Sequence, residues 1–235
     1  MNFSQERGTM RRIAGVLLLC FMIAGAFFWI YDSRKAGRDS VEPDLTMSVK
    51  PAEISEETKR ILNVIGNVRL FDLKMDPEQV FMIKIWVEHF ERGGQQENVI
   101  DYSSGILPHN DPEESGKLHH EQLLFILSEN RDEPNKERRL SITSALIDEE
   151  GSGSTAAEMR LPLLTGGQVT WMNSSELELH LNQPVTLGSI IEFDGHTVNP
   201  GAGSVQEYDA TGELPEELKR HERVFLFRMM LQGHE

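Results

Sequence analysis

Cysteine is nearly absent from this chain. Its 235 residues include a single cysteine, Cys20, which lies inside an apolar segment. An intramolecular disulfide is therefore excluded, and a folded domain must be held together by its hydrophobic core. A domain without thiols fits the exported part of a bacterial envelope protein better than a disulfide-rich animal ectodomain.

Positively charged residues are also scarce. Lys and Arg number 23 against 38 Asp and Glu, and the formal net charge is −15. Residues 1–40 carry six basic and three acidic side chains, so the rest of the chain holds a net charge of −18. Because nucleic-acid binding requires clustered Lys and Arg, this composition argues against a nucleic-acid partner. The acidity either keeps the domain soluble or selects a cationic partner, such as a basic protein patch or a divalent metal.

The common catalytic motifs are missing. The sequence contains no G-x-G-x-x-G, P-loop, G-x-S-x-G or S-x-x-K motif. His120-Glu121 begins like the zinc-protease motif H-E-x-x-H, but Leu124 occupies the place of the second histidine, and the segment is expected to be a strand. His119 and His120 would point to opposite faces of such a strand, so they cannot both bind one metal. No catalytic residue is predicted.

Two further segments resemble sites at first sight. The loop Leu107–Lys117 contains four candidate metal ligands: His109, Asp111, Glu113 and Glu114. Calcium loops place carboxylates at alternate positions with a glycine at the bend, and this loop does not, so a solvated hairpin loop is the favoured interpretation. Asp194-Gly195-His196 is interpreted as a hairpin turn, because Asp-Gly favours two-residue turns. The sequence predicts no metal and no cofactor.

A long apolar run is what the chain does contain. Residues Ile13–Tyr31 include no charged side chain, and basic residues flank the run on both sides. A helix that crosses about 30 Å of hydrocarbon at about 1.5 Å per residue needs about 20 apolar residues. The run therefore predicts a single-pass membrane helix at residues 13–31, behind a short basic tail at residues 1–12.

A cleaved signal peptide and a lipoprotein signal are the alternatives to this anchor. Ala24-Gly25-Ala26 has the small-x-small pattern of a cleavage site, but an apolar core of a signal peptide is usually about 7–15 residues long. Leu19 precedes Cys20 where lipoprotein processing requires a small residue. The length of the run favours an anchor, and cleavage stays open.

The orientation of the anchor rests on weaker features. Three basic residues stand on each side of the apolar run, so the positive-inside rule does not decide. Three features favour export of the C-terminal domain. They are the order of basic tail and apolar core, the aromatic residues Phe27–Tyr31 at the end of the run, and the absence of cysteine after them. We expect a cytoplasmic N-terminus and an extracytoplasmic C-terminal domain.

The residues after the anchor divide into a linker and a domain. Residues 32–57 are polar, contain Pro43 and Pro51, and show no helical or alternating period, so a flexible tether is predicted. Residues 58–235 are long enough to form one soluble domain with its own core. Short helices are expected at Thr58–Ile65 and Glu213–His221.

The domain shows the period of two that is typical of β-strands. Ten segments carry this pattern, at residues 67–75, 80–90, 98–102, 121–128, 140–147, 159–164, 169–172, 177–181, 189–193 and 224–231. Turn residues separate them, among them Arg92-Gly93-Gly94, Gly151–Ser154 and Gly166-Gly167. The predicted fold class is mainly β: an antiparallel β-sandwich or jelly-roll-like domain, with α+β as the alternative.

Three strand residues or segments carry more specific expectations. Trp86 and Trp171 are expected to pack in the core rather than to form a platform for a ligand. The apolar segment Val224–Leu231 predicts either a central strand or a buried interface.

Anchor, tether and sandwich together favour a non-catalytic protein-binding or scaffolding module of the cell envelope. Two alternatives remain: an anchored hydrolase that uses carboxylates and His109, His120 or His196 drawn from distant strands, and a ligand sensor that works with a membrane partner. The oligomeric state, the partner and the biological process are left open.

Overall fold

The protein was analysed as a computed structural model that describes residues 46–106, 117–132, 137–148, 151–172, 176–194 and 203–233. The predicted tail at 1–12 and the predicted membrane helix at 13–31 lie outside these residues. So do His109, Asp111, Glu113, Glu114 and His196. Within the described residues, no helix is long and apolar enough to cross a membrane.

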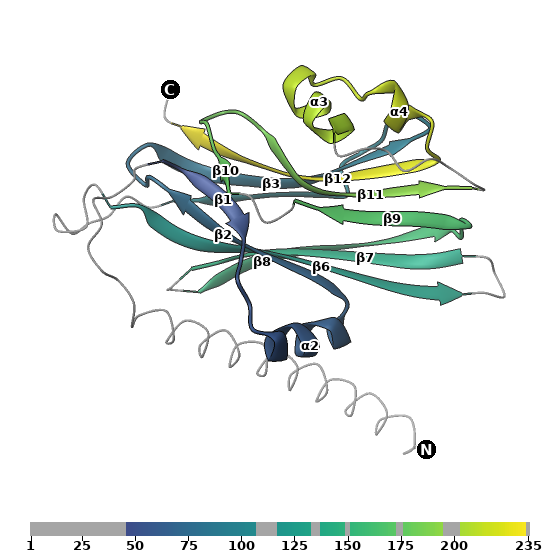
Figure 1. Ribbon diagram of the computed structural model, residues 1–235, viewed down its shortest axis with the longest axis horizontal. Coiled ribbons are helices and arrows are strands. Elements are labelled where there is room, and N and C mark those ends of the chain that lie inside the picture. The colour runs from purple at the N-terminus through teal and green to yellow at the C-terminus, as the bar shows by residue number, and fades with distance from the viewer. Residues whose placement is uncertain are drawn as a thin grey trace, which may run out of the picture. The chain divides into compact units, whose positions relative to one another are not determined.

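Two antiparallel sheets form a β-sandwich (Figure 1). Sheet A has the order β10 (Leu177–Glu178), β1 (Ser48–Pro51), β2 (Asn67–Met75), β6 (His119–Asp132), β7 (Glu137–Ile147), β8 (Ser152–Pro162). Sheet B has the order β4 (Gly94–Gln95), β3 (Val80–Glu91), β12 (Arg223–Gly233), β11 (Val185–Phe193), β9 (Gly166–Trp171), and β5 (Ile100–Gly105) pairs with β3 beside β4. The prediction of a mainly β, antiparallel sandwich is confirmed.

The core lies between the sheets and is strongly aromatic at its centre. The Trp171 ring of sheet B lies 4.8 Å from the Phe227 ring and 5.8 Å from the Phe125 ring of sheet A, measured between centroids. Gly188 on β11 faces the same indole, and a Cβ atom at this position would collide with the Trp171 ring. This close approach falls where the register of β11 against β12 shifts, between Thr186 and Gly188.

Sheet B is covered on its outer face as well. Helix α3 (Gly203–Thr211) and helix α4 (Glu216–Lys219) lie above this sheet in Figure 1. A second apolar cluster fills the space beneath them, made by Phe90, Ile191, Tyr208, Leu214, Leu218, Val224 and Leu226. Strand β12 is therefore buried on both faces and lies between β3 and β11, so the open question about Val224–Leu231 is answered: it is a central strand.

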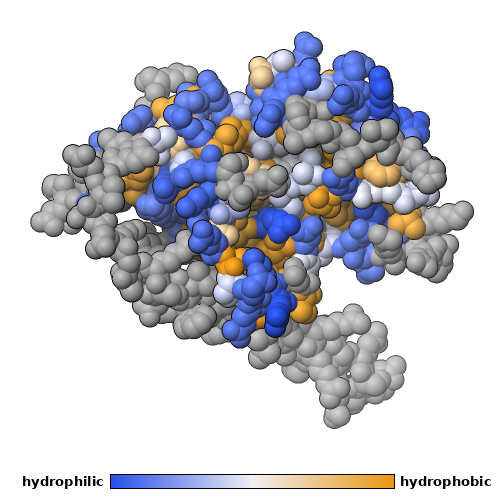
Figure 2. All heavy atoms as spheres, in the orientation of Figure 1, coloured by the Kyte–Doolittle hydropathy of each residue, from blue (hydrophilic) through white to orange (hydrophobic). Residues whose placement is uncertain are grey.

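Helix α2 (Glu56–Ile65) is the one helix described next to sheet A. Ser55 caps its N-terminus, because the Ser55 hydroxyl accepts a hydrogen bond of 3.1 Å from the Thr58 amide. The helix contacts β2 and exposes 52% of Ile61 and 87% of Val64. In the space-filling view, this helix shows a mainly hydrophilic surface with apolar patches beside it (Figure 2).

Strand boundaries differ from the sequence prediction where glycines were taken for turns. Gly153 lies inside β8 and Gly166 begins β9, and a Cβ atom at either position would collide with a facing aromatic side chain, that of Tyr102 or Phe193. The helix α3 was not predicted at all. Its sequence, GSVQEYDAT, combines a glycine with small and polar residues and has no regular apolar stripe.

The predicted tether also differs from the structure at its C-terminal end. Residues 48–51 form β1, which pairs with β2 and β10, and Val49 is fully buried. A strand of four residues is too short to show an alternating pattern, and Pro51 is accepted at its end. The folded domain thus begins before residue 58.

Candidate functional site

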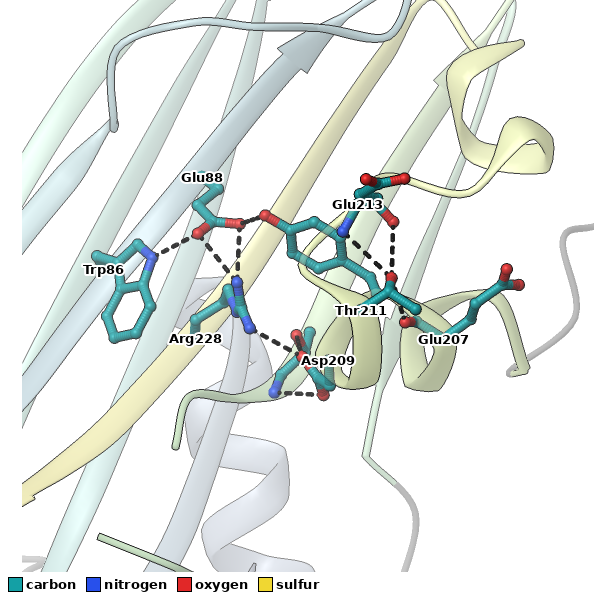
Figure 3. A network of polar contacts seen from close by, with 9 residues as sticks. Trp86, Glu88, Glu207, Asp209, Thr211, Glu213 and Arg228 are labelled. Atoms are coloured by element: carbon teal, nitrogen blue, oxygen red, sulfur yellow. Dashed lines mark hydrogen bonds and ion pairs between the residues drawn. The ribbon is translucent and has the colours of Figure 1, made fainter. Parts of the chain in front are cut away.

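The most concentrated polar group of the described residues lies between sheet B and α3. We call it the Glu88 cluster, and it consists of Trp86 and Glu88 on β3, Thr186 on β11, Tyr208 and Asp209 on α3, and Arg228 on β12 (Figure 3). Strands β3 and β12 pair directly, with Trp86 opposite Arg228, and this pairing brings the strand residues of the cluster together.

Glu88 is the centre of this cluster. One carboxylate oxygen accepts hydrogen bonds from Trp86 Nε1 at 2.8 Å and from Arg228 at 3.1 Å. The other accepts the Tyr208 hydroxyl at 2.7 Å and the same guanidinium nitrogen at 3.3 Å. Glu88 is only 7% exposed, so water does not solvate its carboxylate. These donors replace the hydrogen bonds that water would supply to an exposed carboxylate.

Arg228 joins Glu88 to the helix. Its second guanidinium nitrogen lies 3.1 Å from Asp209, which also accepts the amide of Thr186 at 2.9 Å and its hydroxyl at 2.6 Å. The guanidinium carbon lies 4.6 Å from the centre of the Tyr208 ring and 5.5 Å from that of Trp86. A planar cation between two aromatic rings is a favourable cation–π arrangement.

The chemistry available to this cluster is limited by its own contacts. Burial, followed by the hydrogen bond to Glu88, raises the pKa of Tyr208, so the phenol stays protonated and donates. Both Glu88 oxygens are engaged by protein donors, which leaves no position for a substrate proton. The arrangement clamps α3 onto sheet B.

A second ion cluster joins the two sheets at one end of the sandwich. Glu192 on β11 forms ion pairs with Arg138 on β7 and with Arg223, whose Nε lies 2.7 Å from the Glu192 carboxylate, and all three side chains are buried. Arg223 also donates to the carbonyl of Pro162 at 2.7 Å. Burial lowers the pKa of Arg223. Because Arg138 belongs to sheet A and Glu192 to sheet B, this cluster fixes the spacing of the sheets.

The described residues contain no group of three or more His, Cys, Asp or Glu side chains placed to hold a metal ion. A profile of the YgaN domain family matches residues 48–231. The chain belongs to the YgaN domain family. Its match begins at the first residue of β1 and ends within β12, so the YgaN domain comprises both sheets of the sandwich. Neither a curated protein nor a solved structure shows significant similarity to the chain.

Within the YgaN domain, the histidine pair lies on a strand as expected. His119 and His120 begin β6 and alternate in exposure, with His120 the more exposed. His119 Nε2 lies 3.4 Å from Glu121, whose other carboxylate oxygen is buried without a hydrogen-bond partner. His120 therefore does not join His119 at one site.

The two tryptophans are buried, as expected, but in different places. Trp171 lies in the core between the sheets, and Trp86 lies in the Glu88 cluster on the outer face of sheet B. Asp194 accepts a hydrogen bond of 2.8 Å from Thr165, and the next described element after it is helix α3, not a hairpin strand.

Sequence reasoning missed both ion clusters. It predicted a strand at residues 80–90 but no cover for the face that carries Glu88, whereas α3 covers that face. One signal was present: Arg228 interrupts an otherwise apolar run in a central strand, and such a charge requires a buried partner. The identity of the partner depends on strand order and on α3.

Proposed function

We propose that the chain is a membrane-anchored, extracytoplasmic β-sandwich that binds or scaffolds another protein of the cell envelope without catalysing a reaction. The apolar run at residues 13–31 supports the anchor, and the YgaN domain is the module that it would carry. The acidic net charge of the chain favours a partner with a cationic patch.

One observation carries the non-catalytic part of this proposal. The buried charges that look most like an active site, Glu88, Asp209 and Arg228, bind one another and hold a helix in place. The second cluster, Arg138, Glu192 and Arg223, joins the sheets in the same manner. Side chains used in this way support a rigid platform, and rigid platforms present loops and strand edges to partners.

The anchored hydrolase remains the second candidate because of Glu121. This carboxylate is 4% exposed, one of its oxygens has no hydrogen-bond partner, and His119 lies beside the other. A buried carboxylate next to a histidine is a recurrent element of acid–base sites. The hydrolase hypothesis predicts that Glu121→Gln abolishes an activity without unfolding the protein.

Protease accessibility tests the anchoring and the topology. A C-terminally tagged chain is treated with protease in intact and in lysed cells, and the tag and an N-terminal tag are followed separately. Loss of the C-terminal tag in intact cells, with a protected N-terminal fragment in the membrane fraction, is the expected result. Protection of the whole chain until lysis would exclude an extracytoplasmic domain.

Site-specific photo-crosslinking tests protein binding. A crosslinking residue is placed at exposed positions, Val64 on α2 and Ser154 on β8, and at the buried Phe227 as a control. A discrete crosslinked product in cells that joins the chain to a different protein, specific to an exposed position, is expected of a binding module. Its absence at every exposed position tested would contradict the proposal.

A further inference from the structure

Strand β8 has the longest free edge of the described sandwich. It ends sheet A, and the described strands give it a partner on one side, β7 (Figure 1). Its 11 residues pair with β7 without a bulge. The other edge strands are shorter: β10 and β4 have two residues each, and β5 and β9 have six. A long unbulged edge is a template for pairing with another strand.

The protections that usually block such an edge are missing over most of β8. Residues 152–157 read SGSTAA, with no charge and no proline, and the first charged residue is Glu158. The side chains on the outer face of this stretch, Ser152, Ser154 and Ala156, are exposed and small. A second strand can therefore approach closely.

The hairpin between β7 and β8 shows which backbone groups face outward. The Asp148 amide donates to the Gly151 carbonyl at 3.1 Å, so these residues form a hydrogen-bonded pair. Hydrogen-bonded and non-hydrogen-bonded pairs alternate along an antiparallel ladder. The odd-numbered residues of β8 thus bond to β7. The even-numbered residues direct their N–H and C=O groups away from the sheet, from Ser152 to Arg160.

We propose that β8 pairs in antiparallel fashion with β8 of a second copy of this chain, about a two-fold axis at Ala157, and so joins two A sheets into one. A two-fold interface closes on itself, whereas a parallel pairing would not. An axis at Ala157 gives every outward-facing N–H from Ser152 to Arg160 a carbonyl partner in the other copy.

Charge disfavours the register centred one residue later, on Glu158. With the axis at Ala157, Glu158 lies opposite Ala156 of the partner copy, and Arg160 lies opposite Ser154 of the partner copy. An axis at Glu158 would place two glutamates opposite each other, which is destabilising. The strand carries one acidic and one basic residue, so two such edges meet without net repulsion although the chain is acidic.

A cysteine crosslink tests the axis directly. In the full-length chain in detergent, with Cys20→Ser removing the native thiol, Ala157→Cys places two thiols on the axis. The Cα atoms of such a pair are about 4.5 Å apart, within disulfide range. Met159→Cys is the control, because its two copies would be about 13 Å apart along the strands. We expect an oxidised dimer for Ala157→Cys alone. No dimer, or one for Met159→Cys alone, would overturn the proposal.

Light scattering on the same preparation tests whether β8 holds the dimer. Ala156→Glu places an acidic side chain opposite Glu158 of the partner copy, which is destabilising, and leaves the bonds to β7 intact because the Ala156 backbone groups face outward. The protein mass is expected to fall two-fold, from dimer to monomer. Thr170→Glu on the edge strand β9 is the control and is expected to stay dimeric. A monomeric parent chain, or a dimer that survives Ala156→Glu, would overturn the proposal.

This inference does not depend on the membrane topology or on binding of another protein. A chain that fails the crosslinking and mass tests can still be anchored and extracytoplasmic. Conversely, a cytoplasmic domain can still pair through β8.

Discussion

Helices α3 and α2 lie against the outer faces of different sheets and are held in different ways. Helix α3 sits on sheet B through Tyr208 and Asp209, which are bonded to the buried Glu88 and Arg228. Helix α2 lies next to β2 of sheet A, and the ion pair described on it, Lys59–Glu56, is local and exposed. Helix α3 covers the outer face of sheet B, whereas α2 exposes the apolar residues Ile61 and Val64.

This difference separates the stabilising part of the sandwich from the part that is available for binding. The central strand of sheet B, β12, is buried on both faces and lies between two apolar clusters. Sheet A ends in the long free edge of β8 and lies beside the exposed apolar side of α2. Substitutions on sheet B should therefore change stability, and substitutions on the outer parts of sheet A should change association.

The largest effect is expected for Arg228→Met. The change leaves Glu88 and Asp209 buried without their common cation, and removing one partner of a buried ion pair costs about 3–5 kcal/mol. Urea unfolding followed by tryptophan fluorescence measures it. Arg139→Met on β7 of sheet A is the matched control: Arg139 is half-exposed, 4.0 Å from Glu158, and should cost at most about 1 kcal/mol. Equal losses for the two variants would remove the distinction between the sheets.

The sandwich itself was predictable because alternation of apolar residues survives in most of its strands. Segments 67–75 and 224–231 agree with β2 and β12 within two residues. Strand β1 was not predictable from the sequence, because its four residues become a strand by pairing with β2 and with β10, which is distant in the sequence. Helix α3 escaped for the related reason that its stability comes from contacts with sheet B and not from its own pattern.

The polar clusters were out of reach for sequence reasoning because they combine residues from distant segments. Glu88 and Arg228 are brought together by the pairing of β3 with β12, and Asp209 joins them only through the position of α3. Periodicity predicted the strand at residues 80–90, but a period of two cannot show that a helix covers the face of Glu88. The order of strands would have been needed first.

The contribution of a single contact between α3 and sheet B is smaller. Tyr208→Phe removes one hydrogen bond to a buried carboxylate, which is worth about 1.5–3 kcal/mol. Tyr102→Phe on β5 is the control, because this half-buried ring lies outside the Glu88 cluster. Both variants keep the ring, so their unfolding midpoints compare the hydroxyl groups alone. A loss for Tyr208→Phe no greater than for the control would mean that the phenol does not hold the helix.

Acid should weaken the sheet B side of the molecule. Burial lowers the pKa of His89, which stacks on Phe225, and of His221, which precedes β12, below their usual 6.5. Between the lowered and the usual pKa, the unfolded chain binds more protons than the folded one, so stability is complete above about pH 6.5 and falls as the pH drops below it. Thermal unfolding from about pH 8 to about pH 5 measures the decline. His89→Phe keeps the stack on Phe225 and should make the loss of stability with falling pH less steep. An unchanged pH dependence would assign the effect to other groups.

The smallest effect on stability is expected for Val64→Ser on α2. Val64 is 87% exposed, so replacing it removes little buried apolar surface, and the free energy of unfolding should change by no more than about 0.5 kcal/mol. Leu218→Ser on α4 is the contrasting variant: this side chain is fully buried between α4 and sheet B, and its replacement should cost several times more. If Val64→Ser were as damaging as Leu218→Ser, α2 would be packed as tightly as the helices on sheet B. A neutral result would instead leave the exposed side chains of Ile61 and Val64 available for contact with a partner.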